Sequence, residues 1–217
     1  MVGFRNTRCG LLPVDRPETA YRARDDILSA LVQAEEEGER LSERETHNMP
    51  RLLLIAGIET TTNLIGNGML ALLRNPDQLW RLREDPGLIP RAVEELLRYD
   101  PPAQALFRRA LADCAVNGFE LHKGDNIILL IDTANRDPNA FDDSDRPDVG
   151  RAVCPHLSLG RGIHHCLGAP LARLEGRIVL ETLLERFPEI VLLDERTRFR
   201  GGVVLRRLRS LPIRCRT

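Results

Sequence analysis

A cysteine set between glycines, directly before a helix, constrains this chain more than any other feature of its sequence. In the segment LGRGIHHCLGAP, residues 159–170, Cys166 follows two histidines and precedes Gly168 and Pro170. Proline is favoured in the first turn of a helix, and apolar residues recur at helical spacing after it. The pattern predicts a glycine-rich loop that ends at a helix N-terminus, with a thiol beside that N-terminus.

The chemistry of this junction favours a thiolate ligand. Unpaired backbone N–H groups at a helix N-terminus favour negative charge and stabilise a thiolate. Gly160, Gly162 and Gly168 let the backbone lie close to a flat or bulky group. A thiolate in such a loop suits the axial position of a haem iron, and the nearby His164 could reach a haem propionate.

Three other interpretations of the same residues stay open at this point. Cys166 could be a structural cysteine beside a tight turn. A zinc site could use cysteines and histidines of residues 154–166, although adjacent ligands rarely reach one ion and the spacing is unusual for zinc. A dinucleotide-binding loop fits poorly, because the segment lacks the third glycine and a preceding strand.

Composition limits the class of protein. The 217 residues are 42% hydrophobic and 29% charged with a net charge of −1, which is ordinary for a soluble globular chain and indicates neither nucleic-acid nor membrane binding. We see no signal peptide and no apolar run of membrane-spanning length. Five irregularly spaced cysteines argue against a disulfide framework and favour a reducing cytoplasm.

Helical patterns dominate the first hundred residues, after a lead-in at 1–23 without periodicity. A helix is expected from about Arg24 to near Gly38. A second, long helix should start at Ser42, where SERE forms a capping box with Glu45. Pro50 lies within it, so that helix either kinks there or begins only after the proline.

Shorter elements follow. The segment NPDQLWRLRED predicts a helix capped by Asn75, with Pro76 at its first position. The segment PGLIPRAVEELLRYDPP predicts another helix, which ends at the two prolines that close the segment. Turn signals and a β-rich run over residues 107–137 predict a small sheet. A long loop over 135–163, the helix after Cys166 and weak terminal strands complete a mainly α fold with a small β part.

Four ordered motifs resemble those of the cytochrome P-450 family. LGRGIHHCLG resembles its haem-binding signature, Phe-Gly-x-Gly-x-His/Arg-x-Cys-x-Gly, with Leu159 in place of the phenylalanine. AGIETT at residues 56–61 resembles the oxygen-activation segment of the family's long I helix. EELLR supplies the Glu-x-x-Arg pair, and ANRDPNAFDDSDRPD resembles the meander, with Pro147 at a phenylalanine position.

The resemblance implies a particular part of that fold. It extends from about Arg24 to the C-terminus and corresponds to the C-terminal half: the long I helix, the J, K and L helices, the meander and the Cys loop. We therefore expect one partial domain over residues 24–217. The early helices of the family, with a propionate-binding Trp-x-x-x-Arg segment, have no counterpart here, so a truncated copy, a decaying copy or a gene start assigned too late is expected.

The resemblance also implies roles for single residues. Cys166 would ligate the iron of haem b, in a loop shaped by Leu159, Gly160 and Gly168. Ala56 and Gly57 would be the small residues where the helix passes over the haem. Glu59 would relay protons, and the Thr60 hydroxyl would hydrogen-bond to dioxygen or water.

A second set of roles follows from the other motifs. Glu95, Arg98 and Arg146 would form a buried structural network, and Arg108, with Arg109 as its alternative, would bind a propionate together with His164. His47, His122 and His156 are expected to be ordinary surface or turn histidines.

Two functions are then expected. The first is a haem-thiolate monooxygenase that inserts one oxygen atom from O2 into a small organic substrate, with electrons from a ferredoxin or flavoprotein. The alternative is a non-catalytic haem-binding or haem-free fragment that needs a partner chain or is a relic.

Overall fold

The computed structural model describes residues 24–36 and 38–216. The lead-in expected at residues 1–23 lies outside the described residues. The chain divides into two compact units, Met1–Leu52 and Leu53–Thr217.

The described part of the first unit starts with a short helix. Helix α1, Ile27–Gln33, is capped by Asp26, whose carboxylate accepts a hydrogen bond from the Ser29 N–H at 2.7 Å. The predicted continuation to Gly38 is wrong. Strands β1, Glu35–Glu36, and β2, Glu39–Arg40, form a hairpin instead. Acidic residues are unfavourable at a helix C-terminus, so the run of glutamates ends this helix early.

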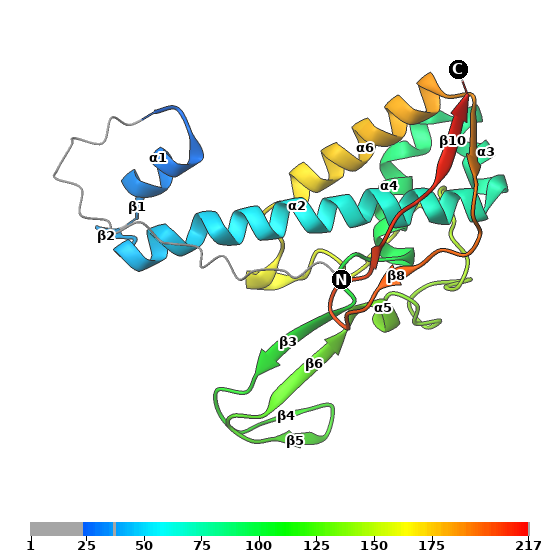
Figure 1. The fold of residues 1–217 in the computed structure, drawn as a ribbon. Helices are drawn as coiled ribbons and strands as arrows, with labels where there is room; N and C mark the ends of the chain where they lie inside the picture. Colours follow the sequence, from blue (N-terminus) through cyan, green and yellow to red (C-terminus); the bar gives the residue numbers. More distant parts are fainter. Residues whose placement is uncertain (1–23, 37, 217) are drawn as a thin grey trace, which may run out of the picture. The chain divides into compact units, whose positions relative to one another are not determined.

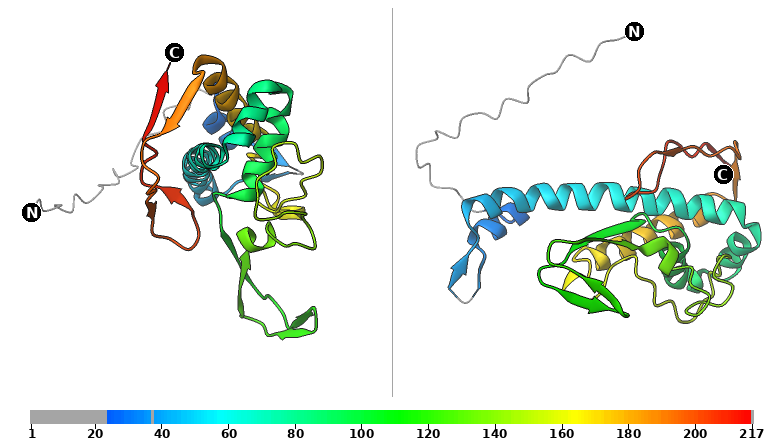
Figure 2. Two further views of the ribbon diagram at one scale, coloured as in Figure 1. Left: turned by 90° about the vertical axis from the view of Figure 1, so that its right-hand side faces the viewer. Right: turned by 90° about the horizontal axis from the view of Figure 1, so that it is seen from below.

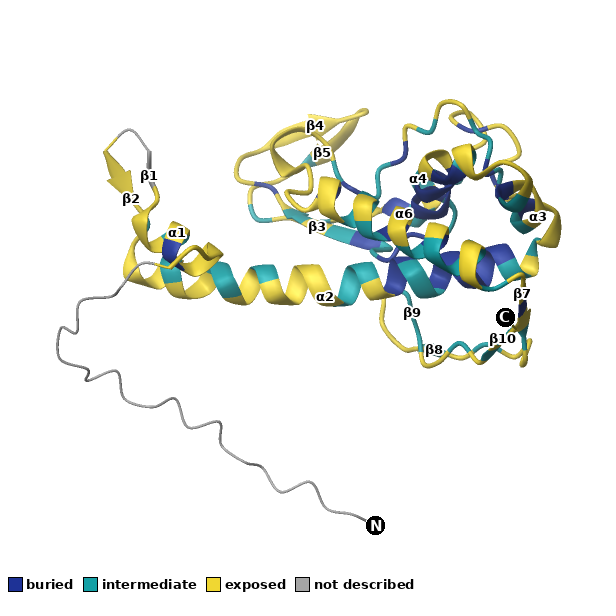
Figure 3. Ribbon diagram, turned by 90° about the horizontal axis from the view of Figure 1, so that it is seen from above, coloured by how far each residue is buried: buried dark blue, intermediate teal, exposed yellow. Residues whose placement is uncertain are grey.

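The long helix α2, Glu43–Arg74, begins where the capping box predicted. The Ser42 N–H donates to Glu45 Oε2 at 2.9 Å, and the Glu45 N–H donates to Ser42 Oγ at 3.4 Å. Pro50 lies inside the helix, so the alternative in which α2 begins only after this proline is wrong. Figure 3 shows that the second half of α2 is buried and much of the first half is exposed.

Three helices build the core of the second unit: the buried half of α2, helix α4 (Ile89–Tyr99) and helix α6 (Ala169–Arg186). Gly176 of α6 lies where all three meet. A Cβ built on it would be 3.3 Å from Val93 and 3.5 Å from Leu64, so a larger residue would push the helices apart. Figure 2 shows α2 end-on with α4 and α6 packed beside it.

Helix α3 and a 3₁₀ turn join α2 to α4. Helix α3, Pro76–Glu84, has Asn75 at its cap position and Pro76 at its start, as predicted. The 3₁₀ turn η1 covers Pro86–Leu88. Helix α4 ends at Tyr99, just before the two prolines at 101 and 102 that the sequence marked as its stop.

The β part consists of two-stranded ladders (Figure 1). Strand β3, Ala105–Arg109, pairs antiparallel with β6, Asn126–Leu130, and the hairpin of β4, Cys114–Val116, and β5, Phe119–Leu121, lies between them in sequence. The short helix α5, Ile131–Ala134, follows. Near the C-terminus β7, Glu189–Leu192, pairs with β10, Ile213–Arg216, and β8, Phe199–Arg200, pairs with β9, Arg207–Leu208.

This architecture confirms the predicted mainly α fold with a small β part. The predicted long loop runs from the end of α5 to the 3₁₀ turn η2, Gly162–His164, directly before Cys166. Among the helices that the structure describes, none combines the length and the apolar character needed to cross a bilayer.

Candidate functional site

The loop that carries Cys166 is closed by its own backbone. The Cys166 N–H donates to the Leu159 carbonyl at 2.7 Å, and the His165 N–H donates to the Gly162 carbonyl at 3.0 Å. Helix α6 starts at Ala169, three residues after the cysteine. The Cys166 side chain is exposed, so its sulfur is held at a helix N-terminus and open to a ligand.

Two glycines give this loop its shape. Gly160 has φ +71°, and a Cβ there would lie 2.8 Å from the His164 carbonyl oxygen, so only glycine fits. Gly162 has φ +62° and open space where a Cβ would be. Ile163 and Leu167 are 97% and 85% exposed, which leaves apolar side chains beside the thiol.

The segment AGIETT lies on α2 and presents small and apolar residues. Ala56 and Gly57 are exposed, and no atom lies within 4 Å of a Cβ built on Gly57. The Thr60 hydroxyl donates to the Ala56 carbonyl at 2.6 Å. The neighbouring side chains Ile55 and Ile58 are also exposed, so this stretch offers an apolar surface next to the Thr60 hydroxyl.

The crossing of α2 and α6 relates this segment to the Cys loop. The helices approach each other at Leu64 and Gly176, and Figure 1 shows them running in the same direction. Gly57 precedes the crossing on α2, and Cys166 precedes it on the chain leading into α6. Both therefore lie on the same side of the crossing.

Glu59 has a partner that the sequence did not suggest. Its carboxylate forms an ion pair with the guanidinium of Arg207 on β9, and both side chains are about one-third exposed. Glu59, the expected proton-relay residue, is thus ion-paired with one of the C-terminal strands.

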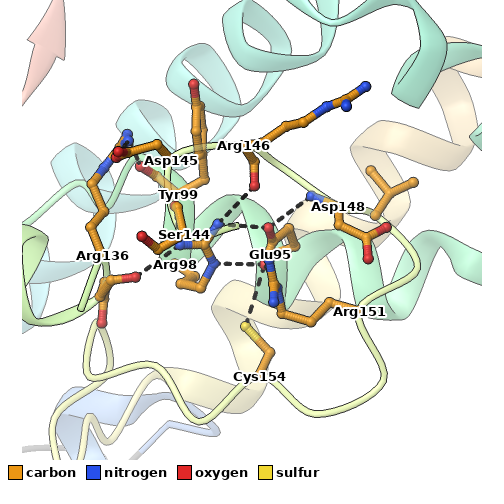
Figure 4. A network of polar contacts seen from close by, with 12 residues as sticks. Glu95, Arg98, Tyr99, Arg136, Ser144, Asp145, Arg146, Asp148, Arg151 and Cys154 are labelled. Carbon is orange, nitrogen blue, oxygen red and sulfur yellow. Dashed lines mark hydrogen bonds and ion pairs between the residues drawn. The ribbon is translucent and has the colours of Figure 1, made fainter. Parts of the chain in front are cut away.

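Glu95 and Arg98 form a fully buried ion pair on α4. Two hydrogen bonds of 2.8 Å join the guanidinium to the two carboxylate oxygens, and both side chains are 0% exposed. The remaining guanidinium N–H groups donate to the backbone carbonyls of Asn135, Ser144 and Arg146. Figure 4 shows Arg98 enclosed by the loop that supplies these carbonyls.

The expected role of the Arg146 side chain needs correction. Its guanidinium points away from Glu95 (Figure 4). It donates to Asp77 Oδ2 at 3.0 Å. Arg151 supplies the additional guanidinium, with Nε at 3.0 Å from Glu95 Oε2. The Arg146 carbonyl faces Arg98, so its backbone, and not its side chain, takes part in the network.

Cys154 belongs to the same network and, unlike the exposed Cys166, is partly buried. Its sulfur lies 3.6 Å from Glu95 Oε2, and burial, with the charge of Glu95, raises the pKa of this thiol to about 12. Among the described residues, no three histidine, cysteine or acidic side chains gather into a group able to hold a metal ion.

Glu94, His156 and Arg173 form a polar cluster beside this network, which the sequence did not predict. Arg173 of α6 donates from Nε and Nη2 to the two oxygens of Glu94, at 2.7 and 2.9 Å. His156 Nε2 lies 3.2 Å from Glu94 Oε2, and the His156 side chain is only 3% exposed. The expectation that His156 is an ordinary surface or turn histidine is therefore wrong.

Arg108 and His164 are the two expected propionate ligands. Among the described contacts, none joins their side chains. Arg108 lies on β3 opposite Ile127, and its guanidinium donates to the Phe107 carbonyl. His164 ends η2 and is exposed. Because side chains alternate along a strand, Arg108 and its alternative Arg109 point to opposite faces of the ladder.

Comparison with known proteins identifies the family. The sequence model of cytochrome P-450 matches residues 15–205. The chain is 46% identical to the polyketide biosynthesis cytochrome P-450 PksS of Bacillus subtilis over 195 residues, 88% of this chain and 48% of that protein. It is 47% identical to cytochrome P-450 107B1 of Saccharopolyspora erythraea, again over 88% of this chain and 48% of the relative.

Solved structures agree. The structure of Bacillus subtilis PksS matches with a TM-score of 0.86 and 45% identity, over 90% of this chain and 51% of that one. A second cytochrome P-450, solved with an acyl carrier protein that carries hexadec-9Z-enoic acid, matches with a TM-score of 0.85 and 44% identity, over 90% of this chain and 50% of that one. The chain belongs to the cytochrome P-450 family and spans about half the length of these relatives, which confirms the predicted partial fold.

Proposed function

We propose that this chain provides the iron-ligating part of a haem-thiolate monooxygenase, which inserts one oxygen atom from O2 into a small organic substrate. One observation carries this proposal: Cys166 is exposed at a helix N-terminus, in a loop whose geometry requires glycine at position 160. Membership in the cytochrome P-450 family supports it.

The residues present fit a haem group. The open space at Gly57 and Gly162, together with exposed Ile163 and Leu167, suits a flat apolar ring next to the sulfur. Cys166 would ligate the iron, and Arg108 and His164 would supply cationic or polar groups for the propionates. The loop residues Leu159, Gly160 and Gly168, with Ala56 and Gly57 across the ring, would complete the contacts of a haem b.

When bound, a thiolate-ligated haem supplies O2 activation and oxygen-atom transfer. The chain would contribute two side chains, those of Thr60 and Glu59, that form hydrogen bonds or transfer protons near the bound group. The Thr60 hydroxyl donates its hydrogen bond to the Ala56 carbonyl, so the lone pairs of Thr60 Oγ1 can accept a hydrogen bond from a water or a substrate hydroxyl. Glu59 can accept or donate a proton once its pairing with Arg207 opens.

The remaining parts of the proposal concern partners and location. Electrons would come from a ferredoxin or flavoprotein, and the protein would act in the cytoplasm. The substrate would be a small organic molecule. Attachment of that molecule to a carrier protein is compatible with the neighbour solved with an acyl carrier protein.

The test is an absorption spectrum of the purified chain mixed with haem, reduced and placed under carbon monoxide. We expect a strongly red-shifted Soret band for the wild type and none for Cys166→Ser. The matched control is Cys114→Ser, which changes another exposed cysteine and should leave the band unchanged. An equal band in Cys166→Ser would overturn the ligand assignment.

A second candidate function is favoured by the apolar side chains that α6 leaves exposed. Leu171, Leu174 and Ile178 are 57%, 45% and 49% exposed, and they recur along one stripe of the helix. A stripe of this kind indicates a covering partner. In that case the chain alone binds haem weakly or not at all, and the red-shifted band appears only after a polypeptide equivalent to the other half of the relatives is added.

A further inference from the structure

The loop that carries Cys166 is held at both ends by one carboxylate, that of Glu94. His156 precedes the loop and Arg173 follows it, on the second turn of α6. Both side chains contact Glu94, which lies on α4, 62 residues before His156 and 79 residues before Arg173 along the sequence. The carboxylate therefore closes residues 156–173 into a ring of contacts around the cysteine.

The His156 side of this arrangement continues into the loop. The Ser158 N–H donates to His156 Nδ1 at 3.2 Å, which leaves the ring proton on Nε2, facing Glu94. Ser158 Oγ donates to the Leu97 carbonyl at 2.7 Å. The next residue, Leu159, accepts the hydrogen bond from the Cys166 N–H, so an unbroken path joins Glu94 to the cysteine backbone.

The Arg173 side of the arrangement is a bidentate pair. Two parallel N–H···O bonds fix both the distance and the orientation of the guanidinium, which a lysine could not do. The side chains of Arg173 and Glu94 are 39% and 27% exposed, whereas that of His156 is 3% exposed. Glu94 is therefore desolvated on its histidine side and solvated on its arginine side.

We propose that Glu94, His156 and Arg173 are positioning residues for the cysteine loop, and that together they set where the Cys166 sulfur stands relative to α2. They act through the backbone of the loop and not by touching the reacting atoms. The consequence for iron ligation rests on the proposed function, whereas the effect on the loop itself does not.

The first test measures hydrogen–deuterium exchange of the haem-free chain by mass spectrometry. We expect Glu94→Gln to raise exchange about tenfold in peptides covering residues 157–170, as the loss of a charged hydrogen-bond partner predicts. Peptides from β7 and β10 should keep the wild-type rate. The matched control is Glu181→Gln, which removes the same charge from a surface pair with Arg177 on α6 and should change no loop peptide.

Two conservative variants separate the two sides. His156→Gln can place its amide N–H near the Nε2 position, toward Glu94, but has no acceptor at the Nδ1 position for the Ser158 N–H. We expect faster exchange at residues 158–166. Arg173→Lys keeps the charge and loses the bidentate geometry, and we expect a smaller increase than in Glu94→Gln. Unchanged loop exchange in all three variants, or an equal increase in every peptide of the chain, would overturn the proposal.

The second readout is spectroscopic and concerns the ligand. At equal haem, we expect the fraction with the red-shifted carbon monoxide band to fall severalfold in Glu94→Gln and to be unchanged in Glu181→Gln. A wild-type chain without that band, both alone and after the complementary polypeptide is added, together with the expected exchange pattern, would reject the haem-thiolate function and leave the loop-positioning role intact. An unchanged band in Glu94→Gln would reject the positioning of the ligand.

Discussion

Thr60 and Thr62 make the same kind of bond two residues apart on α2, which allows a clean comparison. Each hydroxyl donates to the carbonyl four residues before it, at 2.6 Å to Ala56 and 2.7 Å to Ile58. Only Thr60 belongs to the segment expected to activate oxygen. In an active form of the protein, we expect Thr60→Ala to lower the product formed per electron consumed by about tenfold.

Thr62→Ala is the control for that prediction, because it removes an equivalent helix bond. It should leave coupling unchanged. Product and electron use are measured together, so equal coupling in the two variants would remove Thr60 from the mechanism.

Glu94 also gives the chain a pH-dependent stability. Burial alone would raise the pKa of its carboxyl, but His156 and Arg173 outweigh it and hold the pKa at about 2, against an ordinary 4.5. A lowered folded-state pKa stabilises the fold above the unfolded pKa and loses that contribution as pH falls from 4.5 towards 2. After allowance for its partial exposure, we expect about 1–2 kcal/mol.

Urea denaturation at pH 6 and pH 3 measures this contribution. Glu94→Gln should lose less stability than the wild type on going from pH 6 to pH 3, and Glu181→Gln should behave as the wild type. Parallel losses in wild type and Glu94→Gln would show that another carboxyl is responsible.

Single residues of the site differ in how far the sequence predicts them. Cys166 and its glycines lie within one short motif, so their roles can be expected from the resemblance of that motif to the family's haem-binding signature. His156 contacts Glu94, and Glu59 pairs with Arg207, at separations of 62 and 148 residues along the sequence. No local pattern marks such pairs, because only the packing of distant elements brings them together.

At the scale of elements, α4 and the loop after α5 are joined by Arg98. Arg98→Ala would leave the fully buried Glu95 carboxylate with a large part of its charge uncompensated, and we expect a loss of about 3–5 kcal/mol in the free energy of unfolding. Arg146→Ala removes an exposed pair with Asp77 and should cost under about 1 kcal/mol. Chemical denaturation of both variants measures the difference. Equal losses of stability would show that the Arg146 side chain takes part in the buried network.

The elements themselves were predictable where local chemistry decides. The start of α2 follows from the reciprocal bonds of Ser42 and Glu45, and the start of α3 follows from Pro76. The end of α1 was missed because glutamate has a high helix propensity and Gly38 is the first stop signal after Gln33, whereas Glu35–Glu36 pairs with Glu39–Arg40 in the β1–β2 hairpin.

At the scale of the whole molecule, exposed apolar surface should govern behaviour in solution. The stripe on α6 and the exposed half of α2 expose leucine and isoleucine side chains, and surfaces of this kind promote association. We expect the isolated chain to self-associate at micromolar concentration, and Leu171→Arg with Ile178→Glu to reduce it. Sedimentation velocity at several concentrations measures this, and a wild-type monomer throughout would contradict it.

The closure of the Cys166 loop by Glu94 has a thermodynamic consequence for cofactor uptake. The hydrogen bonds that fix residues 156–166 all come from the chain itself. The conformational entropy of this loop is therefore lost when the chain folds, and little of it remains to be lost when a ligand binds. A loop that is ordered in this way binds with a smaller entropic penalty, so in the proposed function the affinity for haem would also depend on the stability of α4.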